Sequence, residues 1–482
     1  MIMNCKQSRQ QHRYRLRQEQ KQLNEQQKAG EQLAVQIKKL FHTVLLKDSL
    51  DEIAKSTGFM TRQREITSSA IVAVLLIGCS GSETISSLET ISSFLKIWFN
   101  ISMKPQSIQA RINRKEAVAF MKEVATRVMK NEANKVIHKL LKKQAKCKLK
   151  HHLYKRVLLQ DSTVISLPDS VARIFKGCGG SASKAAIKCD VIIDQVSHLI
   201  IRIKCVAGRV PDSSLSGDII EFLREGDLVI RDLGYFNLDN FNKMIQKDIK
   251  FISRLIKTVH VYLTKDAETH LNLIEYLEKL GIVNKGIDLV VYIGKKTRIP
   301  MRLIGIKVPQ NVLEARIERH KKTRKCEPSE ELYEWNGYTM MLTNIPKNEL
   351  NLNQILKIYK IRWQIELFFK NIKSYLHVDK LTGKNKYRIL ILIYTKLILT
   401  WLASLLYAYA QVKVIEGKEV SKFKFTKWLQ ENSDWRKVFI TGDFTELFEF
   451  LEGNLEFLCK QSKKRQTSWL NDMIDERNEK AA

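Results

Sequence analysis

The order of predicted strands and helices between residues 156 and 255 most restricts how this chain can fold. Apolar runs rich in β-branched residues occur five times there, and helical stretches separate the last three of them. The predicted strands are Arg156–Leu167, Ala185–Asp194, His198–Ala207, Asp227–Asp232 and Lys250–Leu255, and the predicted helices are Ser213–Glu225 and Leu238–Lys247. Three strands in succession form a meander, whereas helical crossovers add parallel strands. The sequence therefore predicts an α/β fold.

The segments around this core differ from it in composition. The first 40 residues are predicted to form a basic, partly helical arm, with a disordered tail as the alternative. The stretches after Leu50 and after Pro105 have the helix, turn and basic helix of a DNA reader. A long basic helix is expected over Met121–Lys150. We predict a helical DNA-binding region (1–150), a catalytic core in two parts (151–255 and 348–410), a β-rich insertion (256–347) and a helical C-terminal region (411–482).

The charge balance predicts a polyanionic partner. The chain has 82 Lys and Arg against 51 Asp and Glu, a net charge of +31 over 482 residues, which favours binding to nucleic acid. A merely soluble basic protein is the simpler alternative. The eight cysteines are scattered without zinc-ligand spacing, and the first residues lack the apolar core of a signal peptide. These features predict a cytoplasmic protein.

One apolar stretch, Ile389–Ala410, has the length of a membrane span. Lys396 lies near its middle, and a lysine at the centre of a bilayer is costly. We therefore expect a helix buried in the protein, and no membrane partner.

A helix-sized segment near residue 360 combines an apolar face with a polar strip. At 100° per residue, Tyr359, Arg362, Glu366 and Lys373 fall within roughly a 60° arc. A neighbouring stripe is apolar and consists of Ile358, Ile361, Ile365, Phe368, Phe369, Ile372 and Leu376. A fully solvated helix would spread its charges over its open side. This strip instead borders the buried face, where it could meet a metal and a phosphate backbone.

Two aspartates and this glutamate are candidates for a metal site. Asp161 lies inside an apolar strand, and Asp232 ends another strand just before Gly234. Functional groups gather at the carboxyl ends of strands in open α/β sheets. Together with Glu366, these acids suit Mg²⁺ or Mn²⁺, with two ions roughly 3.5–4 Å apart in phosphodiester chemistry. Each acid taken alone is more simply a salt-bridged or capping carboxylate.

The motifs resemble those of a known family. Asp161-Ser-Thr, Asp232-Leu-Gly-Tyr-Phe and Tyr359-x2-Arg362-x3-Glu366-x6-Lys373 resemble the three signatures of DDE transposases. More narrowly, they resemble the insertion-sequence-four family, named for its Y-R-E-K motif. The likeness covers about residues 155–410. It implies a ribonuclease-H-like catalytic core with a β-rich insertion before the glutamate.

The resemblance also implies roles for individual residues. Asp161, Asp232 and Glu366 would be catalytic and hold the metal ions. The DNA-binding residues would be Tyr359, Arg362 and Lys373, together with Arg254, which stands where the family often has an arginine. Trp335 invites comparison with a base-stacking tryptophan of relatives, although a packing role is the simpler interpretation.

The family cuts the ends of mobile elements, often through a DNA hairpin, and joins the 3′ ends to target DNA. Members usually act as a synaptic homodimer on double-stranded DNA. Two alternatives remain open at this stage. One is a ribonuclease-H-like nuclease without strand transfer, and the other is a non-catalytic DNA-binding remnant.

Overall fold

The computed structural model divides the chain into two compact units. Unit 1 comprises Met1–His152, Thr163–Arg209 and Leu367–Thr467, and unit 2 comprises Leu153–Ser162, Val210–Glu366 and Ser468–Ala482. The structure describes residues 2–45, 47–62, 65–81, 87–130, 136–137, 139–141, 154–179, 183–280, 286–376, 385–414, 418–432 and 434–460.

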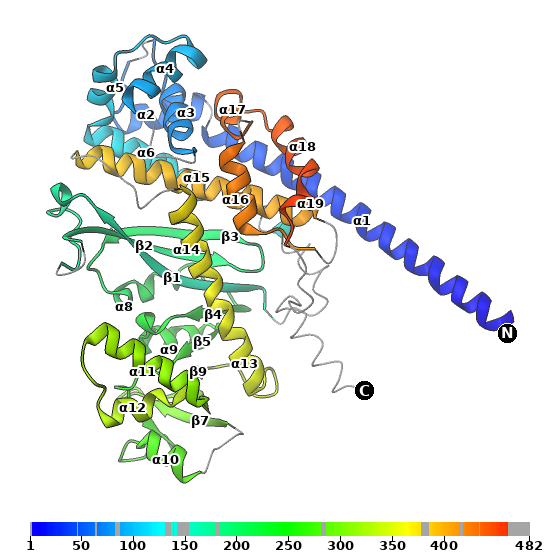
Figure 1. Cartoon of the computed structure of the whole chain (residues 1–482), viewed down its shortest axis with the longest axis vertical. Helices are drawn as coiled ribbons and strands as arrows, with labels where there is room; N and C mark the ends of the chain where they lie inside the picture. The colour runs from blue at the N-terminus through cyan, green and yellow to red at the C-terminus, as the bar shows by residue number, and fades with distance from the viewer. Residues whose placement is uncertain are drawn as a thin grey trace. The chain divides into compact units, whose positions relative to one another are not determined.

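Parallel strands form the centre of unit 2 (Figure 1). β1 (Arg156–Leu167) pairs in parallel with β4 (Asp227–Arg231), which pairs in parallel with β5 (Lys250–Arg254). The central strand β4 is fully buried and contains Leu228, Val229 and Ile230, as expected for a strand covered on both faces. Helix α9 (Leu238–Gln246) connects β4 to β5 and packs against β5.

The strand order identifies the fold. The nine strands follow the order β3-β2-β1-β4-β5-β9-β8-β7-β6. In unit 1, β2 (Ala185–Asp194) and β3 (Leu199–Ala207) form an antiparallel hairpin. A β3-β2-β1-β4-β5 order, with β1, β4 and β5 parallel, is the ribonuclease-H-like arrangement. The predicted α/β fold with a ribonuclease-H-like core is therefore confirmed.

The insertion extends this sheet and is less purely β than predicted. Its antiparallel strands are β6 (Val261–Tyr262), β7 (Ile287–Ile293), β8 (Ile299–Lys307) and β9 (Tyr338–Thr343), and β9 pairs with β5. Its helices are α10 (Leu273–Lys279), α11 (Gln310–Arg324) and α12 (Glu330–Asn336). The highly charged helix α11 forms because it buries Leu313 and Ile317 and its outer charges pair one turn apart, as Lys322 does with Glu318.

The helix expected over Ser213–Glu225 is much shorter in the structure. Only α8 (Asp212–Leu215) and the 3₁₀ turn η2 (Ser216–Ile219) form. The carbonyl of Ser216 accepts a hydrogen bond from the buried Arg231 Nη1 at 2.9 Å, and glycine at position 217 weakens a helix further. The local helical pattern is therefore overridden by a contact with strand β4.

Unit 1 is mainly helical. Helix α1 (Ile2–Leu45) buries a stripe of apolar side chains near its C-terminal end, including Leu33, Ile37 and Leu40, and contacts α6 and α15. The other N-terminal helices are α2 (Lys47–Ser56), α3 (Ser68–Cys79), α4 (Leu88–Phe99), α5 (Pro105–Ile112) and α6 (Lys115–Lys130). The C-terminal helices are α15 (Lys386–Lys413), α16 (Lys422–Glu431), α17 (Asp434–Thr441), α18 (Thr445–Gly453) and α19 (Leu455–Leu458).

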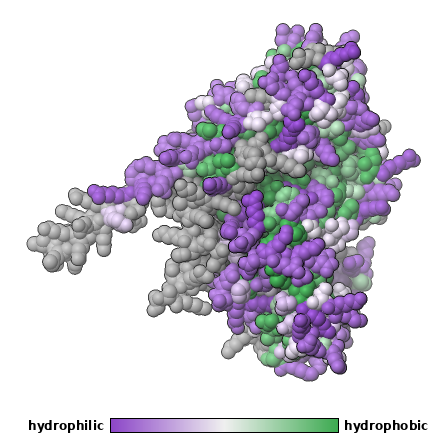
Figure 2. All heavy atoms as spheres, turned by 180° about the vertical axis from the view of Figure 1, so that it is seen from behind, coloured by the Kyte–Doolittle hydropathy of each residue, from purple (hydrophilic) through white to green (hydrophobic). Residues whose placement is uncertain are grey.

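The long apolar helix α15 lies in the core of unit 1. It is long and apolar enough to cross a membrane, but 78% of its most apolar window is buried inside the protein. Lys396 is buried at its centre. This burial agrees with the expected core helix. Hydrophilic side chains cover most of the face shown in Figure 2, with smaller hydrophobic areas between them.

Two predictions for the N-terminal region are not tested by this architecture. The predicted DNA-reading helices fall on α2 and α5, and their contact with DNA stays a prediction. The basic helix expected over Met121–Lys150 begins within α6, but most of residues 131–150 lie outside the described residues. The five segment boundaries also stay predictions.

Candidate active site

The register of β1 and β4 places the two aspartates beside each other in unit 2. Arg156 is the partner of Asp227 at the start of the pair, and Gln160 is the partner of Arg231 at its end. One residue further along each parallel strand, the chain reaches Asp161 and Asp232. Asp232 leaves the sheet as the residue before the 3₁₀ turn η3 (Leu233–Tyr235). Both carboxylates therefore stand where the β1–β4 pairing ends, Asp161 within β1 and Asp232 just after the last residue of β4.

The segment carrying the third acid is a broken helix rather than the continuous one predicted. Helix α13 (Leu352–Tyr359) begins at an Asn351 capping box, the 3₁₀ turn η4 (Lys360–Arg362) follows, and α14 (Trp363–Leu376) continues. The apolar face is buried as expected at Ile358, Ile361 and Ile365. This packing fixes the polar strip at the edge of the buried face, with Arg362 on η4 and Glu366 in the first turn of α14.

One guanidinium joins all three acids. Arg362 Nη2 lies 2.6 Å from Glu366 Oε1, Nη1 lies 3.5 Å from Asp161 Oδ2, and Nε lies 3.8 Å from Asp232 Oδ1. The side chain of Asp161 is 17% exposed, and those of Asp232 and Glu366 are 42% and 43% exposed. The structure thus brings together the three predicted acids and Arg362 at a site open to solvent.

Electrostatics reflects the excess of acid at this site. Burial raises the pKa of Asp161 to about 6, with smaller contributions from the charges of Asp232 and Glu366, against the opposing effect of Arg362 and the Ser162 backbone N–H. Burial acts to lower the pKa of Arg362, but Asp232, Tyr359 and Glu366 outweigh it, so that this pKa is raised. Three carboxylates facing one cation leave negative charge for a further cation to balance.

Tyr359 borders the acids. Burial, followed by the charge of Asp232, raises the pKa of Tyr359 to about 12, while the charges of Arg362 and Arg254 oppose the rise. Its buried hydroxyl has no hydrogen-bond partner among the described residues. An unpartnered buried hydroxyl is costly unless a ligand completes it. Tyr359 therefore has a free donor beside the carboxylates.

Arginines of the insertion lie near the predicted Arg254, and no sequence pattern had singled out these insertion arginines. Arg254 on β5 is the register partner of Met341 on β9. Thr339 lies two residues before Met341 on β9, so its side chain faces the same side of the sheet as that of Met341. Arg316 of α11 donates to Thr339 Oγ1 at 2.7 Å and to the carbonyls of Asn336 and Tyr338. Burial lowers the pKa of Arg316, and the charges of Arg254 and Arg319 add to this. The only sequence signal was the basic content of α11.

A fourth acid also escaped prediction. Asp212, in the first turn of α8, accepts a hydrogen bond from Ser162 Oγ at 2.8 Å, and Ser162 follows Asp161 directly. A Cβ at Gly234 would lie 3.1 Å from Asp212 Oδ2. Gly234 therefore leaves room for this carboxylate behind Asp232. Asp212 thus contacts the residue after Asp161 and lies close to the backbone just after Asp232.

Two other predicted residues lie elsewhere in the chain. Lys373 belongs to unit 1, where its Nζ donates to the Val164 carbonyl at 3.0 Å. Trp335 is half-buried on α12, which packs against α11 and β9. The DNA-binding role of Lys373 stays a prediction, and the position of Trp335 favours neither packing nor base stacking.

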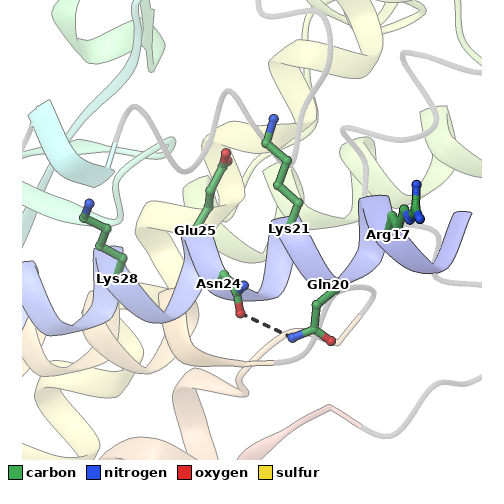
Figure 3. Close-up of a pocket in the computed structure, with 6 residues that line it drawn as sticks. All are labelled: Arg17, Gln20, Lys21, Asn24, Glu25 and Lys28. Atoms are coloured by element: carbon green, nitrogen blue, oxygen red, sulfur yellow. Dashed lines mark hydrogen bonds between the residues drawn. The ribbon is translucent and has the colours of Figure 1, made fainter. Parts of the chain in front are cut away.

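No group of three or more His, Cys, Asp or Glu side chains close enough to hold a metal ion occurs among the described residues. A hollow of about 410 Å³ beside α1 is lined by that helix alone (Figure 3). Its lining residues are Arg17, Gln20, Lys21, Asn24, Glu25 and Lys28. Because one helix supplies every wall, this hollow is an open basic surface of unit 1 rather than a substrate pocket.

Comparisons with known proteins identify the family of the chain. Residues 153–402, just over half of the 482, match the family described as the transposase DDE domain. The chain belongs to this family. The DDE transposase predicted from the motifs is thereby confirmed, and so is its function as a DNA transposase. All the predicted site residues lie within the matched span.

The curated relatives are transposases of bacterial insertion sequences. The IS231C transposase of Bacillus thuringiensis subsp. berliner is 28% identical over 411 residues, covering 80% of this chain and 82% of the relative. The IS1151 transposase of Clostridium perfringens is 24% identical over 398 residues, covering 78% and 82%. Among solved structures, the piggyBac transposase synaptic complex with hairpin DNA matches with a TM-score of 0.44 and 10% identity, covering 89% of this chain and 86% of that chain.

Proposed function

We propose that this transposase cleaves the ends of its mobile element and joins the freed 3′ ends to target DNA. The observation that carries the proposal is the meeting of Asp161, Asp232 and Glu366 around Arg362 where the β1–β4 pairing ends. These acids come from three separate elements inside the matched family domain. Structural ion pairs rarely place three acids on one partly exposed base, because two of the negative charges remain unbalanced.

Mg²⁺ or Mn²⁺, with two ions per site, is the proposed cofactor, and Asp161, Asp232 and Glu366 would hold it. The donor chemistry fits, because carboxylate oxygens are the ligands these hard cations prefer and the acids outnumber their single base. In the arrangement described here the three acids surround Arg362 and are not close enough to one another to hold an ion, so they would have to close around it. Ions bound in this way lower the pKa of a coordinated water or hydroxyl and stabilise charge on the leaving oxygen.

The proposed reaction has two balanced steps. In the first, a water oxygen bonds to the phosphorus at the element end while the bond from phosphorus to the 3′ oxygen breaks, leaving a 3′-hydroxyl and a 5′-phosphate. In the second, that 3′ oxygen bonds to a target phosphorus, a target 3′ oxygen leaves, and the attacking hydroxyl gives up its proton. Asp161, Asp232 and Glu366 position the reacting centre in both steps.

Basic and phenolic side chains around the acids are proposed to hold the DNA backbone. Arg362 can grip a phosphate with two hydrogen bonds, and the free hydroxyl of Tyr359 can donate to another oxygen. Arg254 lies close enough to Arg316 for its positive charge to help lower the pKa of Arg316. A bound DNA phosphate would offset the repulsion between these two arginines. The net charge of +31 would attract both element ends and target DNA.

The assembly and location follow from this activity as further proposals. A synaptic homodimer would bring two terminal inverted repeats together. The DNA substrate places the protein in the bacterial cytoplasm, at the nucleoid. Sedimentation of the protein with and without end DNA tests the homodimer.

A nicking and joining assay tests the activity. The substrate is a labelled duplex carrying the element's own terminal repeat, with a plasmid as target and Mg²⁺ as the added ion. The proposal expects Mg²⁺-dependent nicking at the end, followed by joined products. Nicking without joining would identify a nuclease, and binding without nicking would identify a DNA-binding remnant.

A further inference from the structure

We propose that the Arg362 guanidinium occupies the place of the divalent ions in the DNA-free protein and leaves it when a DNA phosphate arrives. This inference rests on the proposed function. It adds a coupling between metal binding and DNA binding through a single side chain.

The contacts of Arg362 carry the inference. In the described part of the chain, Arg362 is the one cation within ion-pair distance of Asp161, Asp232 and Glu366. Its distances to them range from 2.6 to 3.8 Å, so that only the contact with Glu366 is tight. A loosely shared guanidinium balances the repulsion among the acids without fixing them in a single rigid pair.

A metal ion and this guanidinium compete for the same oxygens. An ion held by the three acids needs their lone pairs, which Arg362 engages, and the two positive charges repel each other at such short range. Metal binding therefore requires Arg362 to withdraw. In the absence of DNA, the ion must displace the Arg362 side chain, and the displaced guanidinium has no negatively charged group to replace the acids it leaves.

DNA supplies such a group. A guanidinium matches a phosphate with two parallel hydrogen bonds. The unpartnered Tyr359 hydroxyl lies close enough to Asp232 and Arg254 for both charges to act on its pKa. Arg362 lies on the 3₁₀ turn η4 between two helices, where its long side chain can turn without unwinding either helix. DNA binding thus clears the acids for metal, and by linkage metal must strengthen DNA binding by the same factor.

The test measures Mn²⁺ affinity rather than activity. Mn²⁺ binding to the DNA-free protein is followed by electron paramagnetic resonance for the wild type, Arg362→Gln and Lys360→Gln. Arg362→Gln should bind Mn²⁺ at least about tenfold more tightly than the wild type. Lys360→Gln is the matched control, because Lys360 is an exposed neighbour on the same turn and its loss changes the net charge equally. It should shift the affinity by no more than about twofold.

The coupling is tested by adding a short oligonucleotide duplex. The duplex should raise the Mn²⁺ affinity of the wild type and of Lys360→Gln, but leave that of Arg362→Gln nearly unchanged. Thermal unfolding gives a second readout: Arg362→Gln should melt earlier than the wild type without metal and be stabilised more by Mn²⁺.

Equal Mn²⁺ affinity of Arg362→Gln and the wild type, or an equal effect of the duplex on both, would overturn the inference while leaving the proposed function standing. The function itself fails on a different result. If Asp232→Asn and Glu366→Gln bound Mn²⁺ as tightly as the wild type, these acids would not be the metal ligands.

Discussion

The two ends of the β1–β4 pair carry contrasting ion pairs. At the start, Arg156 Nε lies 2.8 Å from Asp227 Oδ1 and Nη2 contacts Oδ2, with the side chains 7% and 1% exposed. Arg156 also donates to the Phe222 carbonyl, and Asp227 accepts from the Arg224 backbone N–H. This is one acid for one base, buried and held by several hydrogen bonds.

At the other end of the β1–β4 pairing, one base faces three acids at distances from 2.6 to 3.8 Å and in partial contact with solvent. The difference separates an arginine–carboxylate pair that stabilises the fold from a group of acids suited to bind a cation. A matched, buried pair with all hydrogen bonds made serves the fold. A group with surplus negative charge and an exposed edge is suited to bind a cation.

The largest effect should come from the surplus acids. Asp161→Asn, Asp232→Asn or Glu366→Gln should each lower Mg²⁺-dependent nicking at least about 10³-fold, because each removes charge that binds the cofactor. Binding of end DNA, measured by gel shift, should be nearly intact. Asp248→Asn is the control, since Asp248 is an exposed aspartate of the same unit that pairs with Lys250.

Loss of DNA binding in step with cleavage, or nicking within tenfold of the wild type, would contradict the assignment of these acids as metal ligands.

The matched pair should respond in stability instead. Arg156→Ala should lower the free energy of unfolding by about 3–5 kcal/mol, because it leaves Asp227 buried without a partner. Urea unfolding measures this difference. Asp232→Asn should change stability little or raise it by relieving repulsion among the acids. Equal destabilisation by the two substitutions would erase the contrast between the two ends.

A smaller effect, on DNA affinity, is expected from replacing Arg362, the base among the three acids. Arg362→Ala should weaken binding of end DNA, measured in Mg²⁺, by about 1–3 kcal/mol, the usual loss for a charge-assisted hydrogen bond. Fluorescence anisotropy gives the affinity. An unchanged affinity, together with unchanged nicking, would remove Arg362 from the DNA-binding site.

The smallest effect concerns the insertion. Arg319→Ala should reduce DNA affinity uniformly across sequences and lower the slope of log affinity against log salt by about one. Lys322→Ala on the same helix is the control, because Lys322 pairs with Glu318 at 2.6 Å. If both substitutions change the salt slope equally, α11 acts through its total charge rather than through the Arg254–Arg316–Arg319 cluster.

Much of the core followed from local patterns in the sequence. The five strands of the meander and its crossovers were predictable because β-branched runs and their turns are local signals. Asp161 and Asp232 stood out because an acid in or at the end of an apolar strand is costly without a partner. The spacing of Arg362 and Glu366 placed both on one face before any contact was known.

Other features depend on contacts that the local sequence does not encode. The helix expected after Ser213 is cut short by the hydrogen bond from Arg231, a residue of the next strand. The 3₁₀ turn at Arg362 interrupts a segment whose periodicity is continuous. Asp212 and Arg316 reach the site only through tertiary packing, so that neither carried a distinctive motif.

The most direct test of the central claim is the anomalous scattering of a Mn²⁺-soaked crystal of the transposase bound to its cleaved element end. The account predicts a manganese peak ligated by Asp161, Asp232 and Glu366, with Arg362 turned away to a DNA phosphate. Manganese bound elsewhere, with Arg362 still paired to the three acids, would contradict it.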